Sequence, residues 1–388
     1  MSSKKIVVLG YIGACPIAGV IWQYLHYIIG LQRLGHDVYY VEDTSRYPYN
    51  PQRRTAETDY SYAVKTLASL SERFDFRERW AFRARYLPER PVIGLSGGQL
   101  RKLYREADAI LNVCASHEPH EDLLESERLI LVESDPGALQ IAVDKQDAAT
   151  LSDLRRHHRL FTFGESIGTS SFPVPLHGLQ WLPTRQPVCT DLWDTAAPPP
   201  EGAAYTTVTN WSANASLDWR GKTYLWSKPL QFMNFVDAPA LTGQPFELAS
   251  DIPDRNTAAL FRRNGWRLLH PDTFNYDVDG YRNYVQASKG EFTAAKAIYA
   301  ALDTGWFSDR SACYLAAGRP VITQQTGFTR LYGGTRGLFG FTSMNEALEA
   351  VSRIQADYAL HCDAARDIAK EYFEARHVLK SLLDRVDV

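Results

Sequence analysis

Four consecutive residues, Ser308, Asp309, Arg310 and Ser311, carry groups well suited to binding an anion. Serine and aspartate commonly begin helices, and Gly318 stands where a helix started here would end. The segment predicts a short helix whose N-terminal N–H groups and dipole favour negative charge. The guanidinium of Arg310 and the two serine hydroxyls could add charge-assisted hydrogen bonds to a phosphate. An ordinary helix-to-strand unit without a ligand would show the same local pattern.

Three carboxylates stand where predicted β-strands end, at positions suited to acid–base chemistry. Asp43, Asp135 and Glu165 each follow a short apolar segment. In open α/β sheets ligands bind outside the carboxyl ends of the strands, where a carboxylate can take a proton from a nucleophile. Asp135 is the first choice, although the Pro-Gly that follows it suits an Asx turn equally well. Weaker candidates for the same base are Glu42, His26 and His177.

The first half of the chain has the order expected of a parallel sheet covered by helices. It opens with a predicted strand over 5–9, a glycine-containing loop over 10–13, a helix over 17–34 and a strand over 37–41, which together form a βαβ unit. Further strands are predicted over 109–113, 129–132 and 160–163. Short apolar strands separated by helical segments are typical of an α/β fold.

A proline-rich stretch over 191–203 can continue neither helix nor strand and predicts a linker. The α/β pattern then restarts, so we expect two Rossmann-like domains, over 1–190 and 204–345. The final segment, 346–388, has helical periodicity and is expected to pack back on the N-terminal domain. In the second half, strands are predicted over 205–209, 246–249, 266–269, 287–292 and 319–324, helices near 256–263 and 278–286, and an irregular aromatic stretch over 210–228.

Composition narrows the possible functions. The chain has 388 residues with 45% hydrophobic content, enough for two cores. Its formal net charge of −3, from 42 basic and 45 acidic residues, gives no bulk attraction to nucleic acid. Five scattered cysteines lack the spacing of a zinc site. With no apparent signal peptide or membrane-spanning apolar run, we expect a cytoplasmic protein with reduced thiols.

The two-domain pattern, together with Leu315-Ala-Ala-Gly-Arg-Pro-Val-Ile322 after the predicted helix start, resembles the GT-B glycosyltransferases. The resemblance covers nearly the whole chain. Within the family, the chain looks most similar to poorly characterised bacterial members with a Gly-Trp-Phe-Ser-Asp-Arg-Ser segment. It implies a cleft between an N-terminal acceptor domain and a C-terminal domain that binds a nucleoside-diphosphate sugar. It also implies transfer of a hexose-like sugar to a small molecule or glycan.

The resemblance assigns roles to particular residues. The donor diphosphate is expected at Gly13, Lys228, Ser308, Asp309, Arg310 and Ser311. The sugar is expected at Gln324, Gln325, Thr326 and Gly327. Glu291 is the candidate for the nucleoside, and the base is sought among Asp135, Glu165 and Asp43. Among the aromatic residues Trp211, Trp219, Tyr224 and Trp226, one or two are expected to stack on a ligand.

The expected reaction uses no metal and no cofactor beyond the sugar donor, because helix N–H groups and basic side chains can stabilise the departing diphosphate. Many retaining members carry two glutamates around this helix, whereas Cys313 and Tyr314 stand inside it here. We therefore expect inversion of the anomeric centre. Replacing Arg310 with Ala is expected to weaken donor binding and leave the fold intact.

Three alternatives use similar architecture. A nicotinamide-dependent oxidoreductase would explain Glu42 and Asp43 after the second strand, but the first loop lacks the G-x-G-x-x-G spacing. A two-domain solute-binding protein would close around a ligand without chemistry. A nucleotide-sugar epimerase on the same fold would act on the donor without an acceptor.

Overall fold

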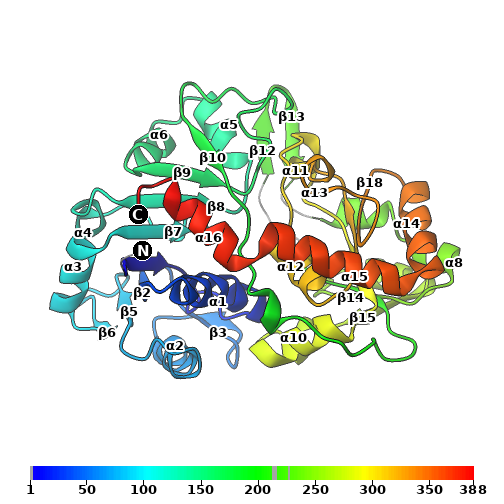
Figure 1. Ribbon diagram of the computed structural model, residues 1–388, viewed down its shortest axis with the longest axis horizontal. Helices are drawn as coiled ribbons and strands as arrows, with labels where there is room; N and C mark the ends of the chain where they lie inside the picture. Colours follow the sequence, from blue (N-terminus) through cyan, green and yellow to red (C-terminus); the bar gives the residue numbers. More distant parts are fainter. Residues whose placement is uncertain (1–2, 212–215, 226–227) are drawn as a thin grey trace.

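The computed structural model describes residues 3–211, 216–225 and 228–388, and its main features are two predominantly parallel β-sheets flanked by helices (Figure 1). The N-terminal sheet has the order β10-β9-β8-β7-β1-β2-β5-β6, in which only β6 is antiparallel to its neighbour. Its central strands β7 and β8 are buried throughout, which is why they read as continuous apolar runs. The strands are β1 (Lys5–Leu9), β2 (Asp37–Thr44), β5 (Trp80–Ala84), β6 (Val92–Gly94), β7 (Ala109–Val113), β8 (Leu129–Glu133), β9 (Arg159–Thr162) and β10 (Trp181–Pro183).

Helices and a small hairpin surround this sheet. The helices are α1 (Ala18–Arg33), α2 (Ser61–Arg73), α3 (Gly97–Glu106), α4 (Glu121–Leu124), α5 (Ala138–Asp144) and α6 (Ala148–Arg155), and the hairpin strands are β3 (Tyr49–Asn50) and β4 (Thr55–Ala56). Strand order reverses between β1 and β7, where β1 pairs with β2 on one side and β7 on the other. Ligands in such sheets bind at this reversal, beyond the carboxyl ends of the strands.

The C-terminal sheet is entirely parallel, in the order β15-β14-β11-β16-β17-β18. Its strands are β11 (Tyr205–Val208), β14 (Phe246–Ala249), β15 (Trp266–Leu269), β16 (Gly290–Thr293), β17 (Val321–Gln324) and β18 (Leu338–Phe341). The reversal of strand order lies between β11 and β16. The helices around it are α7 (Pro229–Met233), α8 (Ala238–Thr242), α9 (Arg255–Arg263), α10 (Val278–Ala287), α11 (Ala297–Ala301), α12 (Asp309–Ala316) and α13 (Thr329–Tyr332), with short helical turns η1 (Thr190–Leu192) and η2 (Pro271–Thr273).

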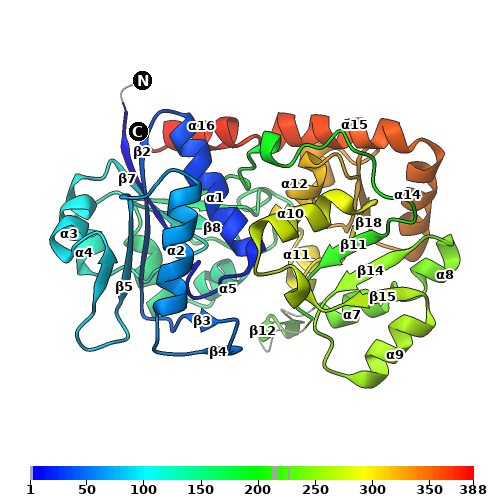
Figure 2. The same cartoon turned by 90° about the horizontal axis from the view of Figure 1, so that it is seen from below.

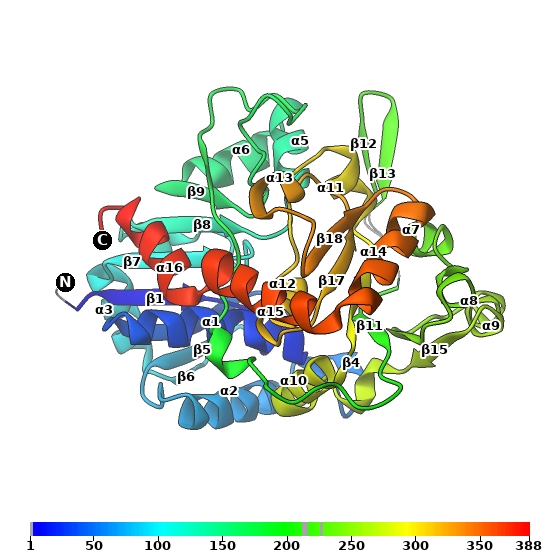
Figure 3. The same cartoon turned by 45° about the vertical axis from the view of Figure 1, so that its right-hand side comes forward.

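The last helices run along one side of the molecule from the C-terminal sheet to the N-terminal sheet (Figures 1 and 3). They are α14 (Met344–Ala356), α15 (Tyr358–Ile368), a π-helical turn η3 (Ala369–Phe373) and α16 (Ala375–Asp384). Helix α16 packs on α1, and α10 lies beside α1 in the view from below (Figure 2). Among the described residues, no helix is both long and apolar enough to cross a bilayer.

The aromatic stretch differs from the sequence prediction because it forms a hairpin, β12 (Ser216–Trp219) and β13 (Lys222–Leu225). Trp211 is 6% exposed and packs in the core of the C-terminal sheet, while Trp219 and Tyr224 pack under α5 and α11. These rings are held in apolar clusters and are not presented to a ligand. Trp226 lies outside the described residues.

A glycine allows the close contact between α1 and α16. A Cβ on Gly30 would lie 2.5 Å from Leu379 Cδ1 and 2.9 Å from Ala375 Cβ. We expect Gly30→Leu to lower the free energy of unfolding by about 1–3 kcal/mol, because overpacking forces apart elements that are otherwise close-packed. Guanidinium-induced unfolding measures the change. Gly98→Ala is the matched control, because a Cβ on this α3 residue meets nothing within 4 Å; equal losses in both variants would contradict the packing argument.

Candidate functional site

The predicted anion-binding helix is α12, with Ser308 at the N-cap position and Gly318 in the left-handed conformation at φ +67° beyond its end. The Ser308 side chain makes no capping hydrogen bond; its hydroxyl lies 3.4 Å from Asp309 Oδ1. Ser311 is fully buried, and its hydroxyl has no hydrogen-bond partner among the described residues. The positive end of the helix is therefore not neutralised by its own N-cap side chain.

Arg310 joins the two strands on either side of the reversal point in the C-terminal sheet. Its Nη1 donates to the carbonyl of Val208 at 2.9 Å, and its Nη2 donates to Thr293 Oγ1 at 3.0 Å. Its Nε donates to Glu291 Oε1 at 2.5 Å, and that carboxylate is completely buried. Glu291, predicted for the nucleoside, instead faces Arg310. Arg310→Ala would leave Glu291 as a buried unpaired charge, which typically costs about 3–5 kcal/mol of stability. The structure therefore contradicts the prediction that this variant keeps its fold intact.

Lys228 supplies a second positive charge. Its side chain is 8% exposed, and no hydrogen bond or ion pair of its ammonium occurs within the described part of the chain. Burial lowers its pKa well below the ordinary value, and the nearby charges of Arg310 and Lys296 lower it further. Such repulsion between partly desolvated cations is relieved when an anion binds between them.

These residues line a cavity of about 300 Å³ beside β11 and the N-terminus of α12, opposite the first turn of α1. Its position beyond the ends of β11 and β16 is the place where open α/β sheets bind ligands. The cavity is lined by Ile17, Gly19, Val20, Val208, Thr209, Asn210, Lys228, Pro271, Asn275, Tyr281, Lys296, Asp309 and Arg310. Thus the structure brings together Lys228, Asp309 and Arg310 of the predicted donor site.

Lys296 was not among the residues predicted for the site, although it stands only a few residues after a predicted strand. Its Nζ donates to Asp135 Oδ1 at 2.7 Å, which links the ends of β16 and β8 across the two sheets. Asp135 thereby lies next to the 300 Å³ cavity, called the donor cavity below after the ligand predicted for it, and the Asp135 side chain is 54% exposed. It is the predicted base whose position fits access to a substrate.

The other two predicted bases are held in networks away from this cavity. Glu165 is bonded to Arg185 at 2.6 Å and also accepts from the Tyr332 hydroxyl. Asp43 is fully buried, accepts from the Tyr104 hydroxyl at 3.0 Å and lies 3.2 Å from His120 Nε2. The structure does not bring either to the donor cavity, because each carboxylate is turned toward its own cationic partners.

Gly13 lies in the loop after β1, whose position is fixed by the buried carboxylate of Glu42. The N–H of Gly13 donates to Glu42 at 2.7 Å, and the N–H of Ala14 donates at 2.9 Å. Burial raises the pKa of Glu42 to about 7, although these two bonds oppose the rise. A Cβ on Gly13 would lie 2.7 Å from Ala63 Cβ. The glycine is needed for this packing and does not line the donor cavity.

The predicted sugar-binding residues make internal hydrogen bonds. The Gln324 amide donates to Gln231 at 2.7 Å, and the Gln325 amide donates to Thr329 at 2.7 Å. Thr326 Oγ1 donates to the carbonyl of Trp306, while the N–H of Gly327 donates to Gln325 Oε1. None of the four lines the 300 Å³ cavity. Gln324 accepts from the N–H of Ala295, the residue that precedes Lys296 in the chain.

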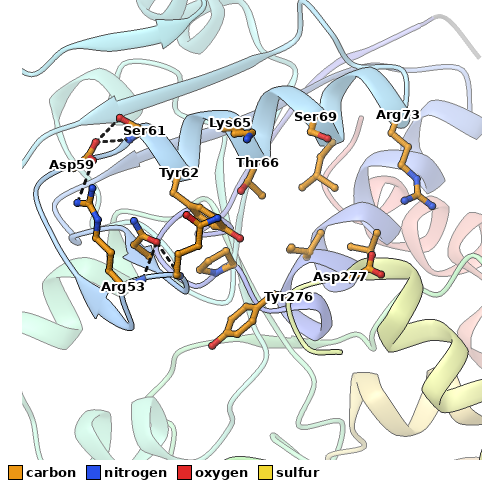
Figure 4. Close-up of a pocket in the computed structure, with 16 residues that line it drawn as sticks. Arg53, Asp59, Ser61, Tyr62, Lys65, Thr66, Ser69, Arg73, Tyr276 and Asp277 are labelled. Carbon is orange, nitrogen blue, oxygen red and sulfur yellow. Dashed lines mark hydrogen bonds and ion pairs between the residues drawn. The ribbon is translucent and has the colours of Figure 1, made fainter. Parts of the chain in front are cut away.

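A larger groove of about 500 Å³ borders the same first turn of α1. Figure 4 shows α2, with Tyr62, Lys65 and Thr66, along one side and Tyr276 and Asp277 on the other. Two of its three basic side chains are already paired, since Arg53 bonds Glu57 at 2.8 Å and Arg73 bonds Asp279 at 2.7 Å. Its third basic side chain, Lys65, is exposed, whereas Lys228 in the smaller cavity is nearly buried.

No protein-family model and no curated protein matches this sequence. Among solved structures, an alpha-glucosyltransferase in complex with UDP and a 13-mer DNA matches 100% of both chains at 10% identity, with a TM-score of 0.61. HepE from Anabaena in complex with UDP matches 99% of both chains at 12% identity, with a TM-score of 0.56. AviGT4, a glycosyltransferase of Avilamycin A biosynthesis, matches 98% of this chain and 97% of its own at 11% identity, with a TM-score of 0.52.

The chain has the GT-B fold. At these identities the likeness establishes the architecture, and it confirms the predicted fold class of two Rossmann-like sheets with a helical C-terminal region.

A buried network positions the turn that carries Asp135. Gln140 Nε2 donates to Glu133 Oε2 at 2.8 Å, and the N–H of Gly137 donates to Gln140 Oε1 at 2.6 Å. Burial raises the pKa of Glu133 from 4.5 to about 8. Between about pH 4.5 and about pH 8 the folded protein keeps this proton, whereas the unfolded chain has released it. The free energy of unfolding therefore falls as the pH rises through this range.

We expect Glu133→Gln to flatten the fall in unfolding free energy between about pH 5 and pH 8, because the amide does not titrate. The effect of one proton is at most ~1.4 kcal/mol per pH unit. Urea unfolding at several pH values measures it. Glu72→Gln, an exposed substitution on α2, should leave the slope unchanged. Parallel pH profiles for the parent protein and Glu133→Gln would show that Glu133 is ionised in the folded state.

Proposed function

We propose that this protein is a glycosyltransferase that transfers a sugar from a nucleoside-diphosphate sugar to an acceptor. The observation that carries the proposal is the convergence of Lys228, Lys296 and Arg310 on one cavity at the N-terminus of α12. A diphosphate would interact with all three basic side chains at once. UDP complexes of structures with the same fold support this interpretation.

The departing diphosphate would be stabilised by side chains alone. Negative charge develops on its oxygens as the bond to the sugar breaks, and preorganised positive groups in a partly buried site lower that barrier. Arg310 is held by Glu291, Val208 and Thr293, so its orientation is set before the ligand arrives. The proposed mechanism therefore assigns no step to a metal ion or another cofactor.

Asp135 would be the base that activates the acceptor, with inversion at the anomeric carbon. Its carboxylate comes from the N-terminal sheet and meets Lys296 of the C-terminal sheet at 2.7 Å. The same lysine also lines the donor cavity. A bound diphosphate would compete with Asp135 for Lys296, which would leave the carboxylate available to the acceptor proton when the donor is in place.

The first test measures thermal stabilisation by UDP, GDP, dTDP, ADP, CMP and NAD⁺. We expect one nucleoside diphosphate to stabilise the protein, by about 2.7 kcal/mol at a ligand concentration 100-fold above Kd. Lys228→Met should weaken that ligand at least tenfold, because it removes a buried cation from the cavity. Lys222→Met, an exposed lysine on β13, is the matched control. Stabilisation by NAD⁺ alone, or an unchanged Kd in Lys228→Met, would contradict the proposal.

Asp135→Asn tests the assignment of the base. Loss of general-base catalysis should lower kcat by about 10²–10⁴-fold, while the Kd for the nucleoside diphosphate should not rise, because the substitution removes the charge that competes for Lys296. Steady-state kinetics with the accepted donor and acceptor give kcat, and NMR of the product gives its anomeric configuration. A retained configuration would rule out the single-displacement mechanism, and full activity of Asp135→Asn would exclude Asp135 as the base.

A further inference from the structure

A second, smaller cavity lies at the carboxyl edge of the N-terminal sheet. It has a volume of about 140 Å³ and is formed by the segments that follow β2, β5 and β7. Strand order reverses between β1 and β7 in this sheet, so the cavity occupies the region where α/β sheets bind ligands. Its volume suits one small group and is too small for a nucleotide.

The cavity is lined by the basic side chains of Arg46, Arg85 and His120 and by the carboxylates of Asp43 and Glu118. The Nη1 atom of Arg85 is buried without a hydrogen-bond partner in the described part of the chain, and its nearest carboxylate oxygen, Asp43 Oδ1, is 3.9 Å away. Buried donors are normally satisfied, so this guanidinium has capacity for an acceptor atom. Arg46 is exposed at the opening, where its guanidinium lies 5.2 Å from the centre of the Tyr11 ring.

A metal ion is a poorer occupant than an anion. Ligand atoms of Asp43, His120 and Asp122 lie within 4.8 Å of one another. Arg83 already pairs with both carboxylates, at 3.4 Å from Asp43 and 2.6 Å from Asp122. Its positive charge compensates the acidic pair and repels a cation, while Arg46 and Arg85 remain toward the cavity.

The loop after β7 is held in an unfavourable backbone conformation that shapes the wall of the cavity. Cys114 and Ala115 have φ angles of +60° and +47°, which cost roughly 1–2 kcal/mol each for residues other than glycine. The turn brings Ser116 and His117 to the cavity. The N–H of Asp43 donates to His117 Nε2 at 2.7 Å, so Nδ1 carries the proton and donates to Ser116 Oγ at 2.8 Å.

Tyr11 connects this cavity with the donor site. Its ring is covered by Arg46 on the side of the small cavity. The pKa of its hydroxyl is raised, first by Cys114 and by burial, and also by the carboxylate of Asp135. Tyr11 of the loop after β1 is thus close both to Arg46 of this cavity and to the carboxylate proposed to activate the acceptor.

We propose that the small cavity binds an anionic group, a carboxylate or a phosphate, of the acceptor substrate. Arg85 and His120 hold the group from inside, Arg46 closes on it from the rim, and Thr44 offers a hydroxyl. Glu118, exposed at the rim, disfavours a second negative charge beyond the first. That this group belongs to an acceptor rests on the proposed sugar transfer. The anion site itself does not depend on that proposal.

The test is calorimetric titration of the protein saturated with UDP, or with the nucleoside diphosphate that binds, so that the donor site is filled. The probes are glucose 6-phosphate, glucuronate and glucose. We expect at least one anionic probe to bind tenfold or more tightly than glucose, and the tighter of the two identifies the group. Arg85→Gln and Arg46→Gln should each weaken that probe by tenfold or more, while Arg101→Gln, an exposed arginine on α3, should not.

Two results would overturn the proposal: equal affinity for all three probes, or unchanged affinity in both Arg85→Gln and Arg46→Gln. Circular dichroism of each variant shows whether it is folded, and Arg46→Gln alters only an exposed residue, so at least one variant reports on binding. If anionic probes bind through Arg85 but no nucleoside diphosphate binds, the anion site stands and the proposed sugar transfer fails. If the diphosphate binds and the anionic probes show no preference, only this inference fails.

Discussion

The buried ion pair between Arg310 and Glu291 is the interaction on which the donor cavity depends. It joins the start of α12 to β16, and the remaining guanidinium nitrogens bond β11 and Thr293. A lone arginine at this depth would be strongly destabilising, and a lone glutamate equally so. The pair fixes the N-terminus of α12 over the reversal point of the sheet.

Opposite charges also pair where the two halves of the chain meet. Lys296 meets Asp135, and Arg185 meets Glu165 beneath the rings of Tyr332 and Tyr372. The second cluster binds the N-terminal sheet to α13 and the C-terminal helices, so it restricts relative movement. The first is half-exposed and lies beside the donor cavity, so a competing anion can break it more easily.

The strands were largely predictable from the sequence, whereas the partners of charged residues were not. Strands 5–9, 109–113, 246–249 and 266–269 were predicted with the bounds that the structure shows, because buried parallel strands are short apolar runs between clear breaks. Strand β16 begins at 290 because α10 extends to 287. Strands β5, β6, β10 and β18 were missed. In β5 an arginine, and in β6 and β18 a glycine, weakens the apolar pattern.

The candidate site shows why charge alone could not rank the predicted residues. Asp43, Glu165 and Glu291 are acidic residues in or just after strands, as is Asp135, but Arg83, Arg185 and Arg310 neutralise the first three. Only tertiary structure reveals such pairing. Lys228 differs from these paired carboxylates because it is a nearly buried basic side chain whose neighbours include other basic side chains. Strongly shifted ionisable groups cluster at functional sites, so Lys228 supports the proposed ligand site.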